Sequence, residues 1–194
     1  MKKRIAHLTS NVLNPFLLCM AVIMLLSFIS SSSMLDALKW SFISIILSVL
    51  PVFLFLLYMV KNDKIDTFFA NIREQRTKIY LSAGFFSLVN GIVLFYLQAP
   101  MILIMAFIAG FSTALIYMLI NLWWKISLHT ALVAASVTVL VMLYGWIAVA
   151  AVALVPLTAW ARIELEYHTL TQTAVGALLA ALIVLGVFYP LILA

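Results

Sequence analysis

The chain has 194 residues, of which 67% are hydrophobic and 9% are charged, whereas soluble domains are roughly 45–50% apolar and about 25% charged. This composition excludes a soluble globular protein and predicts a polytopic membrane protein, because about 20 apolar residues cross the hydrocarbon core as a helix. The net charge of +5 comes from basic residues between apolar runs, where they set orientation instead of binding nucleic acid. A single cysteine, Cys19, can build neither a disulfide nor a cysteine metal site.

Seven apolar segments predict an all-α bundle that forms one domain over residues 1–194. A basic tail, in which His7 is expected to be solvated, precedes the first segment. Pro15 fits the opening turn of the first helix, and Pro51 should bend the second. The block 131–161 is either one overlong helix or two short ones, and Gly145 favours two. The predicted helices cover approximately residues 12–29, 38–60, 79–97, 101–124, 129–144, 146–161 and 171–193.

The distribution of cations predicts the orientation of this bundle. With seven helices, ten of the eleven Lys and Arg residues fall on the side of the N-terminus, and only Lys39 falls opposite. Positive charge is enriched in cytoplasmic loops. We therefore expect the N-terminus to lie in the cytoplasm and the C-terminus outside, in the cytoplasmic membrane of a bacterium or archaeon.

Two short polar stretches interrupt the apolar sequence and hold two of the three histidines. They are KISLHT at residues 125–130 and WARIELEYHTLTQTAVG at residues 160–176. If the last helix has begun by His168, the spacing places Gln172 one turn along the same face, where its amide can orient the imidazole. A histidine whose tautomer is fixed can attack as a nucleophile. We expect the two stretches to meet at one membrane face and to handle a phosphoryl group.

The spacing of these residues resembles the motifs of the type 2 phosphatidic acid phosphatases, a superfamily of acid and lipid phosphatases. The third motif, Ser-Arg-x5-His-x3-Asp, is matched by Arg162, His168 and Gln172. The second, Pro-Ser-Gly-His, corresponds to residues 126–129, which read Ile-Ser-Leu-His. The first, Lys-x6-Arg-Pro, is matched only at Arg76. The similarity runs from about residue 60 onward, and the third motif is its specific part.

This resemblance implies a membrane-embedded phosphatase, with a six-helix core as an alternative to seven helices. His168 would take the phosphoryl group as a phosphohistidine, and His129 would protonate the leaving oxygen. No metal or other cofactor would be required. The substrate would be a lipid or prenyl phosphate or diphosphate in the membrane, without nucleic acid or an obligate protein partner. The residues that bind its phosphate would be Arg162, Arg76, Ser127 and Lys125.

The chain departs from the motifs at several positions. The motif aspartate is Gln172, whose carbonyl accepts an imidazole N–H but carries no negative charge. The lysine position of the first motif falls on Phe69 and its proline on Thr77. Leu128 replaces a glycine whose missing side chain lets the backbone approach phosphate. These departures predict a branch that is slower, differently selective or no longer hydrolytic.

Other interpretations stay open. The residues Asn62, Asp63 and Asp66 resemble the first Mg-binding motif of intramembrane prenyltransferases, which hold a diphosphate through metal. Such an enzyme needs a second acidic loop, for which only Glu164 and Glu166 are candidates. The chain could instead be a non-catalytic membrane protein that binds lipid phosphates. The basic segment 61–78 serves phosphate binding or membrane topology equally well.

Overall fold

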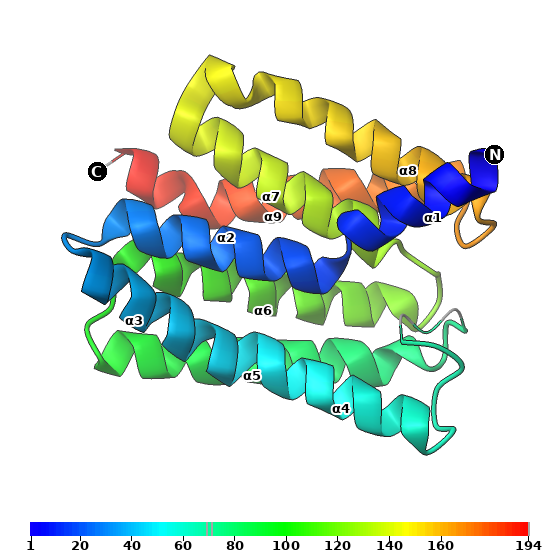
Figure 1. Cartoon of the computed structure of the whole chain (residues 1–194), viewed down its shortest axis with the longest axis horizontal. Coiled ribbons are helices and arrows are strands. Elements are labelled where there is room, and N and C mark those ends of the chain that lie inside the picture. The colour runs from blue at the N-terminus through cyan, green and yellow to red at the C-terminus, as the bar shows by residue number, and fades with distance from the viewer. Residues whose placement is uncertain (69, 71, 194) are drawn as a thin grey trace. The chain divides into compact units, whose positions relative to one another are not determined.

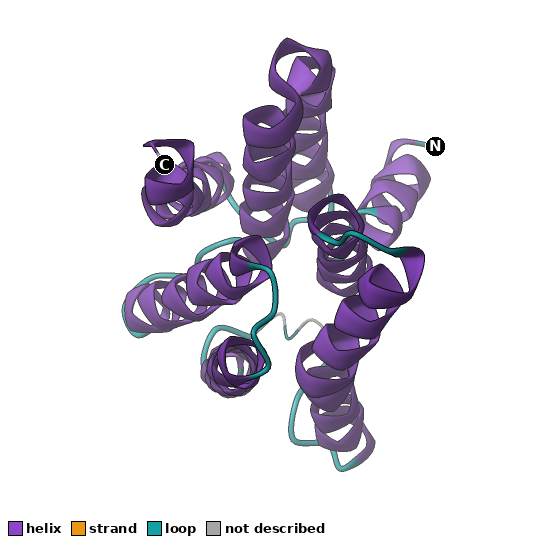
Figure 2. Cartoon of the chain, turned by 90° about the vertical axis from the view of Figure 1, so that its left-hand side faces the viewer, coloured by secondary structure: helices purple, strands orange, loops and turns teal. Residues whose placement is uncertain are grey.

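The computed structural model describes residues 1–68, 70 and 72–193. Every regular element among them is a helix (Figure 2), because a backbone surrounded by lipid must satisfy its own hydrogen bonds. The helices group into two compact units. Unit 1 comprises Met1–Cys19 and Lys125–Gly186, and unit 2 comprises Met20–Trp124 with the end of the chain from Val187.

The predicted class of helical membrane protein is confirmed, but the count of seven spans is not. Among the described residues, five helices are long and apolar enough to cross a membrane, and a sixth arises if a pair bent by 40° counts as one span. That pair is α1 (Lys2–Val12) with α2 (Pro15–Ser30). The other candidates are Met34–Lys61, Arg76–Tyr96, Met101–Asn121, Leu128–Glu164 and Leu170–Tyr189.

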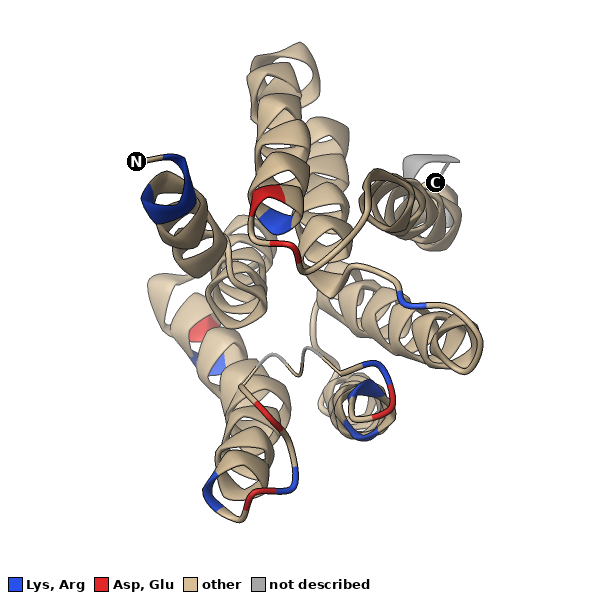
Figure 3. Ribbon diagram, turned by 90° about the vertical axis from the view of Figure 1, so that its right-hand side faces the viewer, with Lys and Arg blue, Asp and Glu red and all other residues tan. Residues whose placement is uncertain are grey.

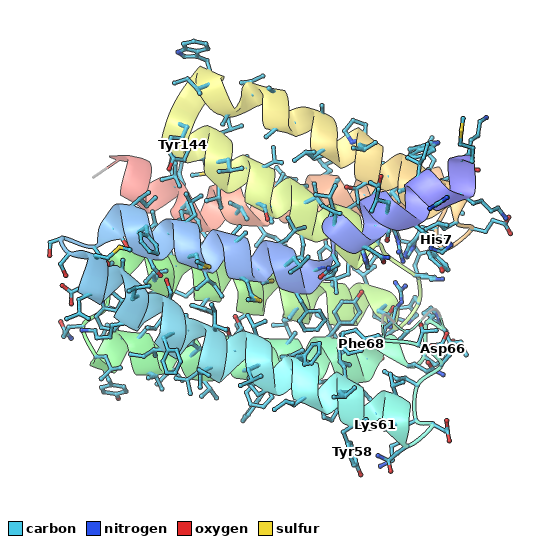
Figure 4. All side chains as sticks on the ribbon, in the orientation of Figure 1. His7, Tyr58, Lys61, Asp66, Phe68 and Tyr144 are labelled. Carbon is cyan, nitrogen blue, oxygen red and sulfur yellow. The ribbon has the colours of Figure 1, made fainter. Side chains whose placement is uncertain are left out.

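The N-terminal residues form a helix where the sequence predicted a tail. Helix α1 buries Ala6 and Ser10 and packs against helix α8 of unit 1, while His7 is exposed (Figure 4). The helix ends where Asn14 caps α2, because the Asn14 Oδ1 accepts the backbone N–H groups of Phe16 and Leu17, both at 3.0 Å. Pro15 then opens α2, where a missing N–H costs nothing.

The apolar block after residue 128 folds back on itself. It consists of α7 (Leu128–Tyr144), a 3₁₀ segment η2 (Gly145–Ala153) and α8 (Leu154–Glu164). Gly145 has φ +59° and ψ −137°, a conformation essentially restricted to glycine. The chain reverses there, beside Tyr144, and α7 packs against both η2 and α8 (Figures 1 and 4). The predicted break at Gly145 is therefore confirmed, and α9 (Leu170–Leu193) follows.

The long helical run that starts at Met34 in unit 2 contains a π-helical turn just before the predicted bend at Pro51. The run comprises α3 (Met34–Ser44), the π-helix η1 (Ile45–Val49) and α4 (Leu50–Lys61). Pro51 has no N–H, and its ring would clash with the carbonyl four residues earlier in an α-helix. A wider π-turn before the proline accommodates both effects, and the Leu50 N–H accordingly bonds the Ile45 carbonyl.

Helices α5 (Arg76–Tyr96) and α6 (Met101–Asn121) pack closely through small residues. A Cβ at Gly110 would lie 2.8 Å from the Ser87 Oγ, so a glycine is needed at this crossing. The Ser87 Oγ donates to the Phe107 carbonyl at 2.9 Å. Beside the contact lies a mostly apolar groove of about 410 Å³ between the two helices, whose composition suits hydrocarbon chains.

Charged residues gather at one end of the helices within each unit (Figure 3). In unit 1 they lie at the start of α1, before α7 and at the end of α8. In unit 2 they lie from the end of α4 to the start of α5, and Asp36 and Lys39 near the start of α3 are the exceptions. Each unit therefore has one charged end, as expected for helices whose ends meet water or lipid headgroups.

We predict that Gly145→Ala lowers the free energy of unfolding by about 1–3 kcal/mol, because alanine is strained at this backbone conformation. No atom lies within 4 Å of the added carbon, so the loss reports backbone strain and not a clash. Gly186→Ala is the matched control, since that helical glycine also has open space around it. Unfolding in mixed micelles measures both, and equal stability of the two variants would contradict the prediction.

Candidate functional site

The turn between α8 and α9 fixes the spacing of Arg162 and His168. The Arg162 carbonyl accepts the Tyr167 N–H at 3.1 Å and the His168 N–H at 3.3 Å, while the Ile163 carbonyl accepts the Glu166 N–H at 2.8 Å. Glu166 adopts φ +59°, as the residue after a helix C-cap does in a Schellman turn. The backbone thus places His168 beside the last turn of α8.

The guanidinium of Arg162 is buried and held from two sides. Its Nη1 donates to the Ser10 Oγ of α1 at 2.8 Å, and its Cζ lies 4.4 Å from the centre of the Tyr167 ring. Arg162 is 2% exposed, so these contacts act in a medium of low dielectric constant, where they are stronger than in water. The guanidinium is a fixed cation at the end of α8.

A capping box begins helix α9. The Thr169 Oγ1 accepts the Gln172 N–H at 3.3 Å, and the Gln172 Oε1 accepts the Thr169 N–H at 3.3 Å, which satisfies two N–H groups of the first turn. The same Oε1 lies 3.0 Å from the His168 Nδ1. Helix α9 starts at Leu170, close to the predicted start at residue 171, so His168 lies before the helix and the periodicity argument does not apply to it. The predicted contact forms because Gln172 folds back at the helix start.

This geometry determines the tautomer of His168. A backbone N–H can only donate, so the Gln172 atom that faces Thr169 is the carbonyl oxygen and not the amide nitrogen. The same oxygen faces the His168 Nδ1, which must therefore carry a proton. A neutral His168 then has its lone pair on Nε2, as a nucleophilic or basic histidine requires.

The second polar stretch reaches Gln172 through the backbone. The Ser127 N–H donates to the Gln172 carbonyl at 3.3 Å, and the Ser127 Oγ caps α7 by accepting the Thr130 N–H at 3.4 Å. His129, in the first turn of α7, is 3% exposed. The N-terminal ends of α7 and α9 are therefore linked, and helix N-termini favour anions.

Gly176 makes this link sterically possible. A Cβ at this position would lie 2.9 Å from the Ser127 carbonyl oxygen and 3.3 Å from the Thr130 Oγ1. Real Cβ atoms essentially never approach another atom to within 3.0 Å, so any larger residue would push α9 away from α7. Gly176 thus has a defined packing role at the contact of α9 with the start of α7.

Six of the seven predicted site residues lie in unit 1, and hydrogen bonds connect four of these six in a chain. Arg162 contacts His168, His168 contacts Gln172, and Gln172 contacts Ser127. His129 and the half-buried Lys125 flank Ser127 by two residues on either side. The seventh residue, Arg76, belongs to unit 2.

Arg76 holds the polar segment before α5 in place. Its Nε donates to the Ala70 carbonyl at 2.8 Å, and the side chain is 4% exposed. Arg73 binds the last carbonyls of α6, those of Asn121 and Leu122, and the Asn121 Nδ2 donates back to the Arg73 carbonyl at 2.9 Å. Both arginines thus hold this segment in place. These contacts are compatible with a role of segment 61–78 in membrane topology.

The acidic residues of the same segment are exposed. Asp63 and Asp66 lie in the connection between α4 and α5 (Figure 4), and Asp63 adopts φ +54°. Within the described part of the chain, no three His, Cys, Asp or Glu side chains come together as a metal site would need. Phe69, which occupies the lysine position of the first motif, lies outside the described residues.

Two contributors to the site were missed from the sequence. The Thr169-x-x-Gln172 pattern before an apolar run is a recognisable capping box, so Thr169 could have been found. Ser10 carries no sequence signal, because it meets Arg162 from 152 residues away. Comparison with protein-family models, curated proteins and solved structures returned no match.

We predict that Gly176→Ala lowers the free energy of unfolding by about 1–3 kcal/mol, as overpacking does in a close-packed contact. The loss arises because the new methyl group displaces α9 from the Ser127 carbonyl. Gly186→Ala is again the matched control, in the same helix and with open space around it. An unfolding titration of both variants tests this, and a Gly176→Ala protein as stable as the control would refute the close approach.

Proposed function

We propose that the chain is a membrane-embedded phosphatase or diphosphatase that removes phosphate from a lipid or isoprenoid phosphate without a metal ion. The observation that carries this proposal is the contact of 3.0 Å between the His168 Nδ1 and the Gln172 Oε1. It directs the lone pair of a neutral ring to Nε2, and the turn that carries His168 also carries the buried Arg162. A nucleophile, a clamp and an acid are the parts that phosphoryl transfer through a phosphohistidine needs.

The charge of the candidate site favours a phosphate group. Arg162 and Lys125 are cations, and the N-termini of α7 and α9 add partial positive charge. The nearby Glu166 is exposed and pairs with Lys3, whose Nζ lies 3.3 Å from the Glu166 Oε1. Arginine binds phosphate oxygens through several N–H groups at once, which suits Arg162 to the role of a clamp.

The reaction proceeds in two steps in this proposal. The His168 Nε2 attacks phosphorus, the bond from phosphorus to the leaving oxygen breaks, and His129 gives that oxygen a proton. The resulting phosphoimidazolium keeps its Nδ1–H on the Gln172 Oε1. A water molecule then attacks phosphorus and gives a proton to His129, while the phosphorus–nitrogen bond breaks and inorganic phosphate leaves.

The similarity to the motifs of the type 2 phosphatidic acid phosphatases supports the same assignment. Arg162, His168 and Gln172, which have the motif spacing Arg-x5-His-x3-Gln, are connected by hydrogen-bond contacts. Arg76 belongs to unit 2, so this proposal rests on residues of unit 1 alone. Gln172 in place of the motif aspartate makes slow turnover the expected behaviour, because a neutral amide stabilises the imidazolium less than a carboxylate does.

The proposed arrangement in the membrane has seven crossings. The bent pair α1 and α2 forms one, and the reversal at Gly145 lets α7 and the η2–α8 segment cross separately. The charged ends then lie in the cytoplasm, by the positive-inside rule. The substrate headgroup would meet this charged rim while its hydrocarbon tail stays among the helices.

We predict that His168→Ala abolishes phosphate release, whereas Asp63→Ala leaves it almost unchanged. The reason is that His168 forms the covalent intermediate, while the exposed Asp63 takes no part. Phosphate release from phosphatidate and a panel of prenyl diphosphates, by purified protein in detergent with EDTA, measures both variants beside the wild type.

The opposite pattern would replace this proposal. Activity that survives His168→Ala but is lost with Asp63→Ala or with EDTA would indicate a metal-dependent, prenyltransferase-like enzyme. An absence of turnover on every substrate, both with EDTA and with added Mg²⁺, would indicate the non-catalytic, lipid-phosphate-binding alternative.

We predict further that Gln172→Glu raises kcat by about two- to tenfold, because a carboxylate stabilises the positive charge of the phosphoimidazolium. Stability should be retained, since Glu also serves at this position of a capping box. Gln172→Leu is the control, and it should lower both kcat and stability because it can neither orient His168 nor cap α9. Steady-state kinetics and thermal unfolding measure these effects, and a slower Gln172→Glu enzyme would contradict the assigned role of His168.

A further inference from the structure

Helix α1 contacts the turn that carries Arg162 and His168 at two points. The Ser10 Oγ accepts the Arg162 Nη1–H at 2.8 Å, and the Lys3 Nζ lies 3.3 Å from the Glu166 Oε1. Both contacts lie within unit 1. The N-terminal helix therefore holds the turn that links the proposed clamp to the proposed nucleophile.

The two contacts differ in strength. Lys3 and Glu166 are largely exposed, with side-chain accessibilities of 68% and 80%, and such surface pairs contribute little. Ser10 and Arg162 are 5% and 2% exposed. A hydrogen bond from a charged donor is strong in such surroundings. The hydrogen bond between Ser10 and Arg162 is therefore the stronger of these two links between α1 and the site.

The position of Ser10 determines where the guanidinium points. The Tyr167 ring lies against Arg162 at 4.4 Å from Cζ, and Ser10 binds one terminal nitrogen in addition. The five N–H groups of arginine form a rigid planar fork. A ring contact together with one bonded nitrogen thus restricts how the other N–H groups can turn.

We propose that Ser10 is a positioning residue of the phosphate clamp and that α1 is part of the functional site. The proposal rests on the proposed function. Ser10 does not touch the substrate; it aims Arg162 at the phosphate oxygens. Because such a clamp binds the ground state and the transition state similarly, loss of Ser10 should weaken substrate binding more than it slows chemistry.

The test uses the full chain in detergent and a pair of substitutions with the same shape. Ser10→Thr keeps the hydroxyl, whereas Ser10→Val replaces it with a methyl group, so the pair isolates the hydrogen bond. Ser10→Ala removes the hydroxyl without added bulk. Asn11→Ala is the control, because Asn11 is an exposed residue of the same helix. Thermal unfolding of each variant is measured beside the kinetics.

The expected result is a KM about tenfold higher in Ser10→Val and Ser10→Ala, with kcat changed by less than about twofold. Ser10→Thr and Asn11→Ala should keep the wild-type KM. A merely structural role for Ser10 would lower kcat together with the fraction of folded protein and leave KM unchanged. Equal KM values for Ser10→Thr and Ser10→Val would therefore overturn the proposal while leaving the phosphatase activity established.

Inactivity of the wild type would overturn the proposed function separately, and titration with inorganic phosphate would then decide the role of Ser10. Weaker phosphate binding by Ser10→Val than by Ser10→Thr would support positioning in a protein that only binds phosphate. Equal binding by the two variants, or no binding by the wild type, would overturn it.

Discussion

The close approach of Gly176 to the carbonyl oxygen of Ser127 is the constraint on which the candidate site depends. A single added carbon atom would stand 2.9 Å from that oxygen, so the two helix starts meet only because α9 carries no side chain there. The backbone bond from the Ser127 N–H to the Gln172 carbonyl follows from this packing. The two polar stretches, residues 125–130 and 160–176, are thereby joined, although 29 residues lie between them in the sequence.

The local parts of this arrangement could be predicted from the sequence because each has a short-range cause. Pro15 fixes its own φ, and Gly145 permits a conformation that other residues rarely adopt. The corresponding helix boundaries were therefore predicted closely. Apolar length identified the spanning helices in the same way. The contact between His168 and Gln172 was also predicted, but from helix periodicity; a capping box produces it instead.

The parts that could not be predicted depend on tertiary packing. Helix α1 has the composition of a basic tail, and only its burial against α8 shows that Ser10 meets Arg162. Arg76 illustrates the converse case. Its motif position suggested a phosphate ligand, whereas its Nε holds a loop carbonyl, a contact that spacing alone cannot indicate. Sequence spacing thus identifies residue types and leaves their partners open.

Gln172 gives His168 a neutral partner in place of the ionisable aspartate of the motif. An aspartate that orients an imidazole loses its charge in acid, and it also attracts divalent cations. The amide of Gln172 does not titrate and brings no negative charge to attract cations, and its oxygen is fixed by the backbone of Thr169. The orientation of His168 therefore does not depend on the protonation state of its partner, as an orientation by a carboxylate would.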